Sequence, residues 1–345
     1  MQASDLRTLV VPFAAAVMLV VAVTAGAGVV ADYADGPRST QPDAPAYDAA
    51  TLLADPVADD GTVPTPDASE SKTVVVDVSH GNAVSRSTLQ PLVNALVAGG
   101  HDVRFYGGGS SPVGYASSEG SAFARTLQDA DALVVANPAS AYSGDEVDTV
   151  EEFSDAGGRV LLLADTPSSA TSATSLLGLS TGTSSSASGQ PDDVAARFGL
   201  TFDAGYLYDM TENANNFQYV YGTPSGGSEF AGDAERVVFD AAVPVVADDD
   251  VTTAVAVEDA SYSTTRKDGT YSVVVRDGNV VAVGDTWAFS PDGATVADNE
   301  VLVGDTAEFL VSGSKTPGAP QTGSPGSTGG TTLPTGGSTG ASATA

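Results

Sequence analysis

Residues 73–82, which read TVVVDVSHGN, decide how the chain is expected to fold. The first six residues are apolar or β-branched apart from Asp77, which is the pattern of a short strand buried on both faces of a parallel sheet. Leu92 and Leu96 follow at helical spacing, and a Gly-Gly pair at 99–100 ends the pattern. The stretch therefore predicts a strand followed by a helix.

This unit repeats along the chain. Further short apolar runs predict strands, and periodic segments between them predict helices. The expected strands are 101–106, 132–136, 159–164, 235–240, 252–258, 270–276 and 279–283, and the expected helices are 122–127, 145–156, 192–198 and 299–311. Because strands and helices alternate, we expect right-handed crossovers and an α/β fold with a doubly wound, mainly parallel sheet.

The charge of the chain is strongly one-sided. Acidic residues outnumber basic ones by 44 to 13, which gives a formal net charge of −31. At molar salt the Debye length falls to about 3 Å, so this self-repulsion is screened. We therefore expect a halophilic protein, and 42% hydrophobic residues favour a packed core over an acidic disordered chain. Nucleic acid is not an expected partner, because phosphate binding needs clustered Lys and Arg.

Cysteine is absent from the chain. This excludes thiol catalysis, disulfides and iron–sulfur ligation, and leaves carboxylates, hydroxyls, amides and two histidines for chemistry. We expect no cofactor and no metal site.

The N-terminal segment has no charged residue from Thr8 to Val30. As a helix it would be roughly 33 Å long, enough to cross a hydrocarbon core of about 30 Å. We therefore predict a single-pass transmembrane anchor in the cell membrane, with the N-terminus inside and the main domain outside, because Arg7 precedes the helix while Asp32 and Asp35 follow it. The alternative is a cleaved signal peptide and a secreted protein.

The expected organisation has four parts. They are an anchor over 1–31, a disordered Pro/Asp-rich spacer over 32–71, an α/β domain over 72–312, and a disordered Ser/Thr/Gly/Pro-rich tail over 313–345.

Polar residues follow several of the predicted strands. In open α/β sheets ligands bind beyond the carboxyl ends of the strands, so these residues are the candidates for a site. The catalytic candidates are Asp77, His80 and Asp285, since paired carboxylates and an imidazole can divide acid and base roles or bind a cation. The ligand-binding candidates are Asn82, Asn137, Asp165 and Trp287. Alternatively, these side chains cap helices or bind loop amides.

A cluster of aromatic and amide side chains offers a different kind of site. It could bind sugar or peptide, or it could be a loop that packs on the edge of the sheet. Its members are Tyr206, Tyr208, Asn213, Asn215, Asn216, Phe217, Tyr219 and Tyr221.

The order of several motifs resembles a known family. The motifs are VVVDVSHGN at 74–82, Asn137-Pro138, AGGRVLLLAD at 156–165, ARFGL at 196–200, VVAVGDTWAFS at 280–290 and Asp298-Asn299. Together they resemble the haloarchaeal type of the family called domain of unknown function 4350, which is related to the auxiliary domain of gliding-motility-type ABC transport systems and to class I glutamine amidotransferases.

The resemblance implies a flavodoxin-like or class I glutamine-amidotransferase-like sheet and a membrane-associated role beside transport or envelope machinery. Amidotransferase activity is excluded, because that chemistry uses a cysteine nucleophile and this chain has none.

Two hypotheses about function follow. The first is a non-catalytic extracytoplasmic binding or scaffolding domain that contacts the bilayer through its anchor and works with membrane transport or envelope proteins. The second is a hydrolase or cation-dependent enzyme that uses Asp77, His80 and Asp285. A cleft that brings these three side chains within about 5 Å of one another would favour the enzyme.

Overall fold

The computed structural model describes residues 15–20, 22, 56–67, 70–108, 119–166, 189–226, 230–248 and 250–321. The chain divides into two units, Met1–Ala54 and Asp55–Ala345. All strands of the described part lie in the second unit, and the first contributes a short exposed helical segment at 15–20.

One large sheet forms the second unit. Its first half is parallel, in the order β2-β1-β3-β4-β12. The strands are β1 (Thr73–Asp77), β2 (Asp102–Tyr106), β3 (Ala132–Ala136), β4 (Arg159–Leu163) and β12 (Val280–Val283). All five match strands that the sequence predicts, at 73–78, 101–106, 132–136, 159–164 and 279–283.

The second half of the same sheet is antiparallel. Beyond β12 the order continues β11-β10-β7-β8, and β6 pairs with β10. These strands are β6 (Leu207–Tyr208), β7 (Tyr219–Pro224), β8 (Val237–Asp240), β10 (Thr252–Tyr262) and β11 (Lys267–Asp277). A separate two-stranded sheet pairs β5 (Leu200–Phe202) with β9 (Val245–Ala247).

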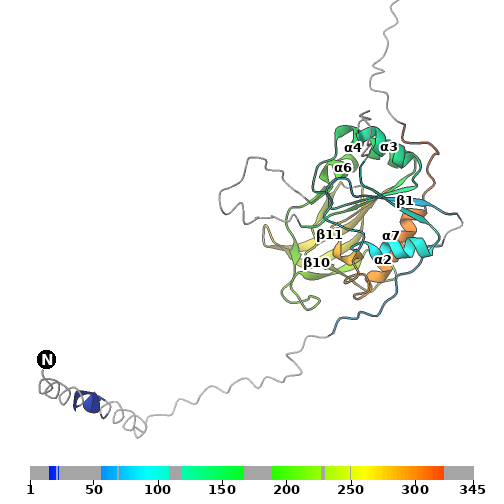
Figure 1. Cartoon of the computed structure of the whole chain (residues 1–345). Helices are drawn as coiled ribbons and strands as arrows, with labels where there is room; N and C mark the ends of the chain where they lie inside the picture. Colours follow the sequence, from blue (N-terminus) through cyan, green and yellow to red (C-terminus); the bar gives the residue numbers. More distant parts are fainter. Residues whose placement is uncertain are drawn as a thin grey trace, which may run out of the picture. The chain divides into compact units, whose positions relative to one another are not determined.

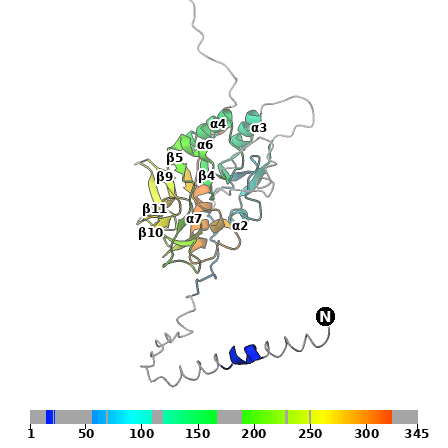
Figure 2. The same ribbon diagram turned by 90° about the vertical axis from the view of Figure 1, so that its left-hand side faces the viewer.

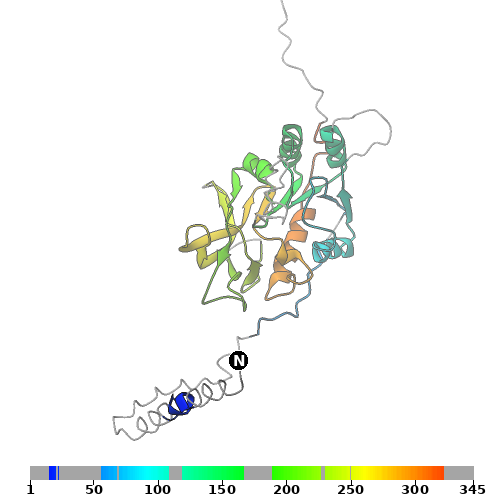
Figure 3. The same ribbon diagram turned by 60° about the vertical axis from the view of Figure 1, so that its left-hand side comes forward.

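The prediction of a doubly wound, mainly parallel sheet of flavodoxin-like or amidotransferase-like kind is therefore wrong, because the sheet is mixed. Figure 3 shows the long β10–β11 hairpin of the antiparallel half. Gly278 and Asn279 form a second tight turn, which joins β11 directly to β12. Strands joined by such short connections run antiparallel, since a parallel pair needs a crossover of a dozen or more residues.

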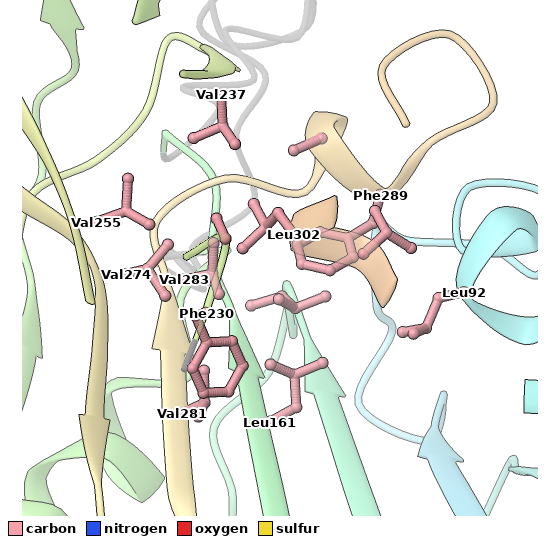
Figure 4. Packing of buried hydrophobic residues seen from close by; sticks show 14 of the residues in the cluster. Leu92, Leu161, Phe230, Val237, Val255, Val274, Val281, Val283, Phe289 and Leu302 are labelled. Atoms are coloured by element: carbon pink, nitrogen blue, oxygen red, sulfur yellow. The ribbon is translucent and has the colours of Figure 1, made fainter. Parts of the chain in front are cut away.

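The helices cover both faces of the sheet (Figures 1 and 2). The larger core cluster joins α2 and α7 to one face, and the second joins α3, α4 and α6 to the other. Their bounds are α2 (Gln90–Ala98), α3 (Glu119–Gln128), α4 (Gly144–Asp155), α6 (Asp192–Ala195) and α7 (Asn299–Val311), with short 3-10 turns η2 (Ala196–Phe198) and η3 (Trp287–Phe289). Figure 4 shows Leu92, Phe289 and Leu302 beside the strands that carry Leu161 and Val281.

Local chemistry sets the start of α4. The side chain of Ser143 accepts a hydrogen bond from the backbone N–H of Glu146, and the Glu146 carboxylate accepts one from the backbone N–H of Ser143. This reciprocal pair satisfies two amides that the first turn of a helix leaves without partners.

No helix in the described residues is long and apolar enough to cross a membrane. The fold that we expected included an N-terminal transmembrane helix, and the residues that the structure describes contain no such helix. Most of the segment 8–30 lies outside the described residues.

The packed part of the chain extends beyond the expected domain limits at 72 and 312. We name residues 56–67 the strap. Ala58 of the strap accepts a backbone hydrogen bond from Ala297, and the Asp59 carboxylate accepts one from the Thr295 hydroxyl at 2.7 Å. At the other end, Lys315 donates to the backbone carbonyl of Gln128 at 3.0 Å.

Candidate functional site

The candidate residues lie in a row along one edge of the sheet. Asp77 ends β1, Asn137 follows β3, Asp165 follows β4, and Asp285 follows β12. Since these strands are neighbours in the order β1-β3-β4-β12, the row follows the carboxyl ends of four parallel strands.

Asp77 is fully buried and fully bonded. Its Oδ1 accepts hydrogen bonds from the backbone N–H of Ser79 at 3.0 Å and from the Ser79 hydroxyl at 2.6 Å. Its Oδ2 accepts from the Tyr142 hydroxyl and lies 2.7 Å from Nδ1 of His80. Burial alone raises the pKa of Asp77, but the hydrogen bonds from His80, Ser79 and Tyr142 outweigh it and hold the pKa below its usual value.

His80 lies between two carboxylates. Its Nδ1 faces Asp77, and its Nε2 lies 3.6 Å from Oε2 of Glu146. The imidazole stacks on the ring of Tyr142, with centroids 3.7 Å apart. Burial lowers the pKa of His80, but hydrogen bonds to Asp77 and Glu146 and the two negative charges raise it to about 9. The same contact with His80 lowers the pKa of Glu146 to about 2. We therefore assign His80 as a cation that donates to Asp77 from Nδ1 and forms an ion pair with Glu146 through Nε2.

A second group of side chains surrounds Asp165. Its Oδ1 accepts from the backbone N–H of Thr286 at 2.9 Å, and its Oδ2 accepts from the Thr286 hydroxyl at 2.6 Å and from the Asn137 amide at 2.8 Å. These bonds tie the ends of β3, β4 and β12 together.

The Asp285 carboxylate accepts hydrogen bonds from backbone N–H groups. Its Oδ1 accepts from the backbone N–H of Trp287 at 2.8 Å, and its Oδ2 accepts from those of Asp240 and Ala288, both at 3.2 Å. Complete burial and the nearby negative charge of Asp165 raise the pKa of Asp285 well above its usual range. Its side chain therefore acts as an acceptor that closes the loop after β12.

The structure thus brings Asp77 and His80 together and leaves Asp285 apart from them. Three strand spacings separate β1 from β12, and at about 4.8 Å each they amount to roughly 14 Å. In the described residues no group of three or more His, Asp or Glu side chains has the geometry to hold a metal ion.

The other candidates also have structural partners. The Asn82 amide donates to the carbonyl of Ala136 at 2.7 Å, and its oxygen accepts from the backbone N–H of His80. The Trp287 ring stacks on Tyr219, with centroids 5.0 Å apart.

Tyr142 and Glu146 complete the His80 cluster and were not among the candidates. The spacing Ser143–Glu146 is a capping-box signal that sequence reasoning could have found. That signal predicts the start of a helix, whereas the contact of Glu146 with His80 depends on how α4 packs against β1.

The predicted aromatic cluster separates into two parts. Tyr219 stacks on Trp287, and the guanidinium of Arg236 lies 4.0 Å above the ring of Tyr221. Tyr206, Tyr208 and Phe217 form a different contact series, with centroid distances of 6.2 and 6.3 Å. Phe217 is 41% exposed in this second part, and the neighbouring Met210 is 71% exposed. We name residues 206–217 the aromatic loop.

Comparison with known proteins shows likeness in family and in fold. The model of the family described as Domain of unknown function (DUF4350) matches residues 103–303. Among solved structures, the mmIFT52 N-terminal domain is similar with a TM-score of 0.51 and 9% identity, covering 69% of this chain and 97% of that one. A ThuA-like protein from Parabacteroides merdae has a TM-score of 0.42 and 13% identity, covering 70% and 90%. No curated protein matches the chain significantly.

Proposed function

We propose that this chain, which belongs to the DUF4350 family, is a non-catalytic binding or scaffolding domain that works outside the cytoplasm with membrane partners in transport or cell-envelope assembly. One observation carries the first half of this proposal. The polar groups at the carboxyl ends of the strands are bonded to one another or to backbone amides, so they act as structural ties.

The protonation states support this reading over catalysis. A general base must accept a proton from a group within hydrogen-bond reach. His80 has a pKa of about 9 and is occupied by carboxylates on both sides, so near neutral pH it holds its proton. Asp77 and Asp285 are 0% and 1% exposed, respectively. A hydrolase or cation-dependent enzyme that uses these three side chains together does not fit their separation.

The aromatic loop supplies the contact surface. Met210 and Phe217 are exposed, and the ring of Tyr208 contacts the rings of Phe217 and Tyr206. The loop also carries Asp209 and the exposed Glu212, so a partner would meet apolar side chains with carboxylates beside them. Aromatic residues and Met are also the types enriched at protein interfaces.

The transport or envelope context rests on the sequence resemblance. We also propose, from this resemblance, that the chain is of the haloarchaeal type of the family. We propose too that it is related to the auxiliary domain of gliding-motility-type ABC transport systems. The similarity to the mmIFT52 N-terminal domain, at 9% identity, concerns the fold alone.

The test is cross-linking capture of the tagged full-length protein from intact cells at native salt. We expect one reproducible transport or envelope protein of the membrane, and its recovery should fall at least tenfold in a Met210→Ser/Phe217→Ser variant. The matched control is Val246→Ser, which replaces another exposed apolar side chain, 53% exposed and outside the aromatic loop.

Two results would contradict the proposal. One is equal recovery of the partner by the loop variant and the wild type. The other is a turnover activity of the purified protein that disappears in Asp77→Asn while the fold is retained.

The exposed rings also favour a second candidate, which is binding of surface saccharide or peptide by the aromatic loop. Sugars stack on aromatic faces of this kind. Retention of the protein on isolated surface glycans, and loss of that retention in Tyr208→Ala, would favour this candidate over a protein partner. Tyr219 and Tyr221 are poor positions for the test, because both rings have partners within the domain.

A further inference from the structure

The strap packs against two glycines, Gly304 and Gly99, and we name this contact surface the seat. A Cβ atom at Gly304 of α7 would lie 2.7 Å from the ring of Pro64, and one at Gly99, just after α2, would lie 3.1 Å from the ring of Pro66. Such distances are shorter than van der Waals contact. The absence of side chains at these two glycines therefore makes room for two proline rings.

An uncharged groove of about 440 Å³ runs beside this seat. Its lining comes from the strap, from α2 and from one residue after η3, namely Thr62, Val63, Thr65, Gln90, Pro91, Asn94, Ala95, Ala98 and Pro291. The whole stretch 87–100 carries no charged residue, although the chain has 44 acidic ones. The groove therefore suits an extended segment without charged side chains.

The C-terminal tail contains a segment of this chemistry. Residues 62–65 of the strap read TVPT, and residues 332–335 of the tail read TLPT. From Thr316 to the end of the sequence the tail has no charged residue. We propose that residues 332–335 dock where residues 62–65 of the strap lie, beside the groove, with the ring of Pro334 at Gly304 in place of Pro64.

The one difference within the four residues fits the groove. Leu333 has one methylene more than Val63, and Val63 borders the open part of the groove. Burial of one methylene strengthens binding by about fourfold. Leu333 therefore compensates in part for the absence of a second proline in the tail.

What the tail lacks is the second proline. Gly336 stands where the strap has Pro66, which is buried against Gly99. A glycine loses more conformational freedom on ordering than a proline does. The strap is also joined directly to the domain, which gives it a high effective concentration at the seat. The tail is therefore the weaker occupant, and it docks in the fraction of molecules whose strap is displaced.

Engineered cysteines give a clean test, because the chain has none of its own. Asn94 is exposed and lines the groove. In full-length protein at molar salt, Asn94→Cys/Thr335→Cys should form a disulfide under mild oxidation at least fivefold faster than Asn94→Cys/Ser324→Cys, whose second cysteine lies in the tail outside the motif. Gel mobility then distinguishes a bond within one chain from a bond between two copies, and either supports docking.

Two further variants test the seat itself. Gly304→Ala should lower the rate of disulfide formation to that of the Asn94→Cys/Ser324→Cys pair, because its methyl group fills the place of the proline ring. Helix α7 should persist, since alanine is a better helix former than glycine. Gly336→Pro should raise the rate several-fold, and Gly144→Ala, where nothing lies within 4 Å of the added Cβ, should leave it unchanged. Equal rates for the two cysteine pairs, or a rate insensitive to Gly304→Ala, would overturn the proposal.

Discussion

Replacement of His80 by glutamine should remove a stabilisation that depends on pH. The pKa of His80 is raised from 6.5 to about 9 by hydrogen bonds to Asp77 and Glu146 that overcome the opposing effect of burial. At about 1.4 kcal/mol per pKa unit, the shift corresponds to at most about 3 kcal/mol of folding free energy. The folded state binds the proton more tightly than the unfolded chain does. The contribution is therefore complete below pH 6.5 and is lost as the pH rises through about 9.

The assay is chemical denaturation of wild type and His80→Gln at molar salt, from near pH 6 to near pH 9.5. The difference in free energy of unfolding should shrink by about 2–3 kcal/mol over this range. Wild type and variant share all their other titratable groups. The difference between their free energies of unfolding therefore reports the titration of His80.

His101→Gln provides a control of opposite sign. Burial lowers the pKa of His101, so its contribution to stability should increase as the pH rises through 6.5. A wild-type minus His80→Gln difference that is equal at both ends of the pH range would falsify the assignment of His80 as a buried cation.

Three further outcomes are expected. Gly284→Ala places a Cβ 1.9 Å from the carbonyl oxygen of Val243 and should lower the free energy of unfolding by about 1–3 kcal/mol or more, whereas Gly144→Ala in α4 should not lower it. Asp285→Ala leaves three backbone N–H groups without their acceptor and should cost about 1–3 kcal/mol in the same assay; an unchanged midpoint would show that water replaces the carboxylate. Dialysis from molar to low salt should reduce the helical circular dichroism of the wild type, because the net charge of −31 is then unscreened, and a constant spectrum would argue against halophilic adaptation.

The parallel half of the sheet could be predicted from the sequence because its strands are short, apolar and separated by helices. The runs at 132–136 and 159–164 are buried almost throughout, which is what a strand between two helical layers requires. The closing helix was also predicted at its observed position, Asn299–Val311.

In the antiparallel half the strands at 235–240, 252–258 and 270–276 were predicted, but their direction in the sheet was wrong for a physical reason. In β10 and β11 buried and exposed residues are mixed over eleven positions, and bulges interrupt the alternation that marks a half-exposed strand. The stretch from 200 to 283 contains no helix in its described residues, and this alone should have indicated antiparallel pairing.

The candidate site was predictable only as far as single strand ends. Asp77 and His80 are three residues apart, so their contact follows from one tight turn. The separation of Asp285 depends on the strand order, which places β3 and β4 between β1 and β12. Glu146 reaches His80 from another helix, and no local pattern carries that information.

Glu146 gives the turn after β1 and the first turn of α4 a common acceptor. Its Oε2 takes hydrogen bonds from the backbone and hydroxyl of Ser143 and also faces His80. When alkali removes the proton of His80, the carboxylate keeps its bonds to Ser143 and remains an effective cap for the helix. Alkaline conditions should thus weaken the contact between the turn after β1 and the first turn of α4, while the buried Val147, Val150 and Phe153 keep the helix packed on the sheet.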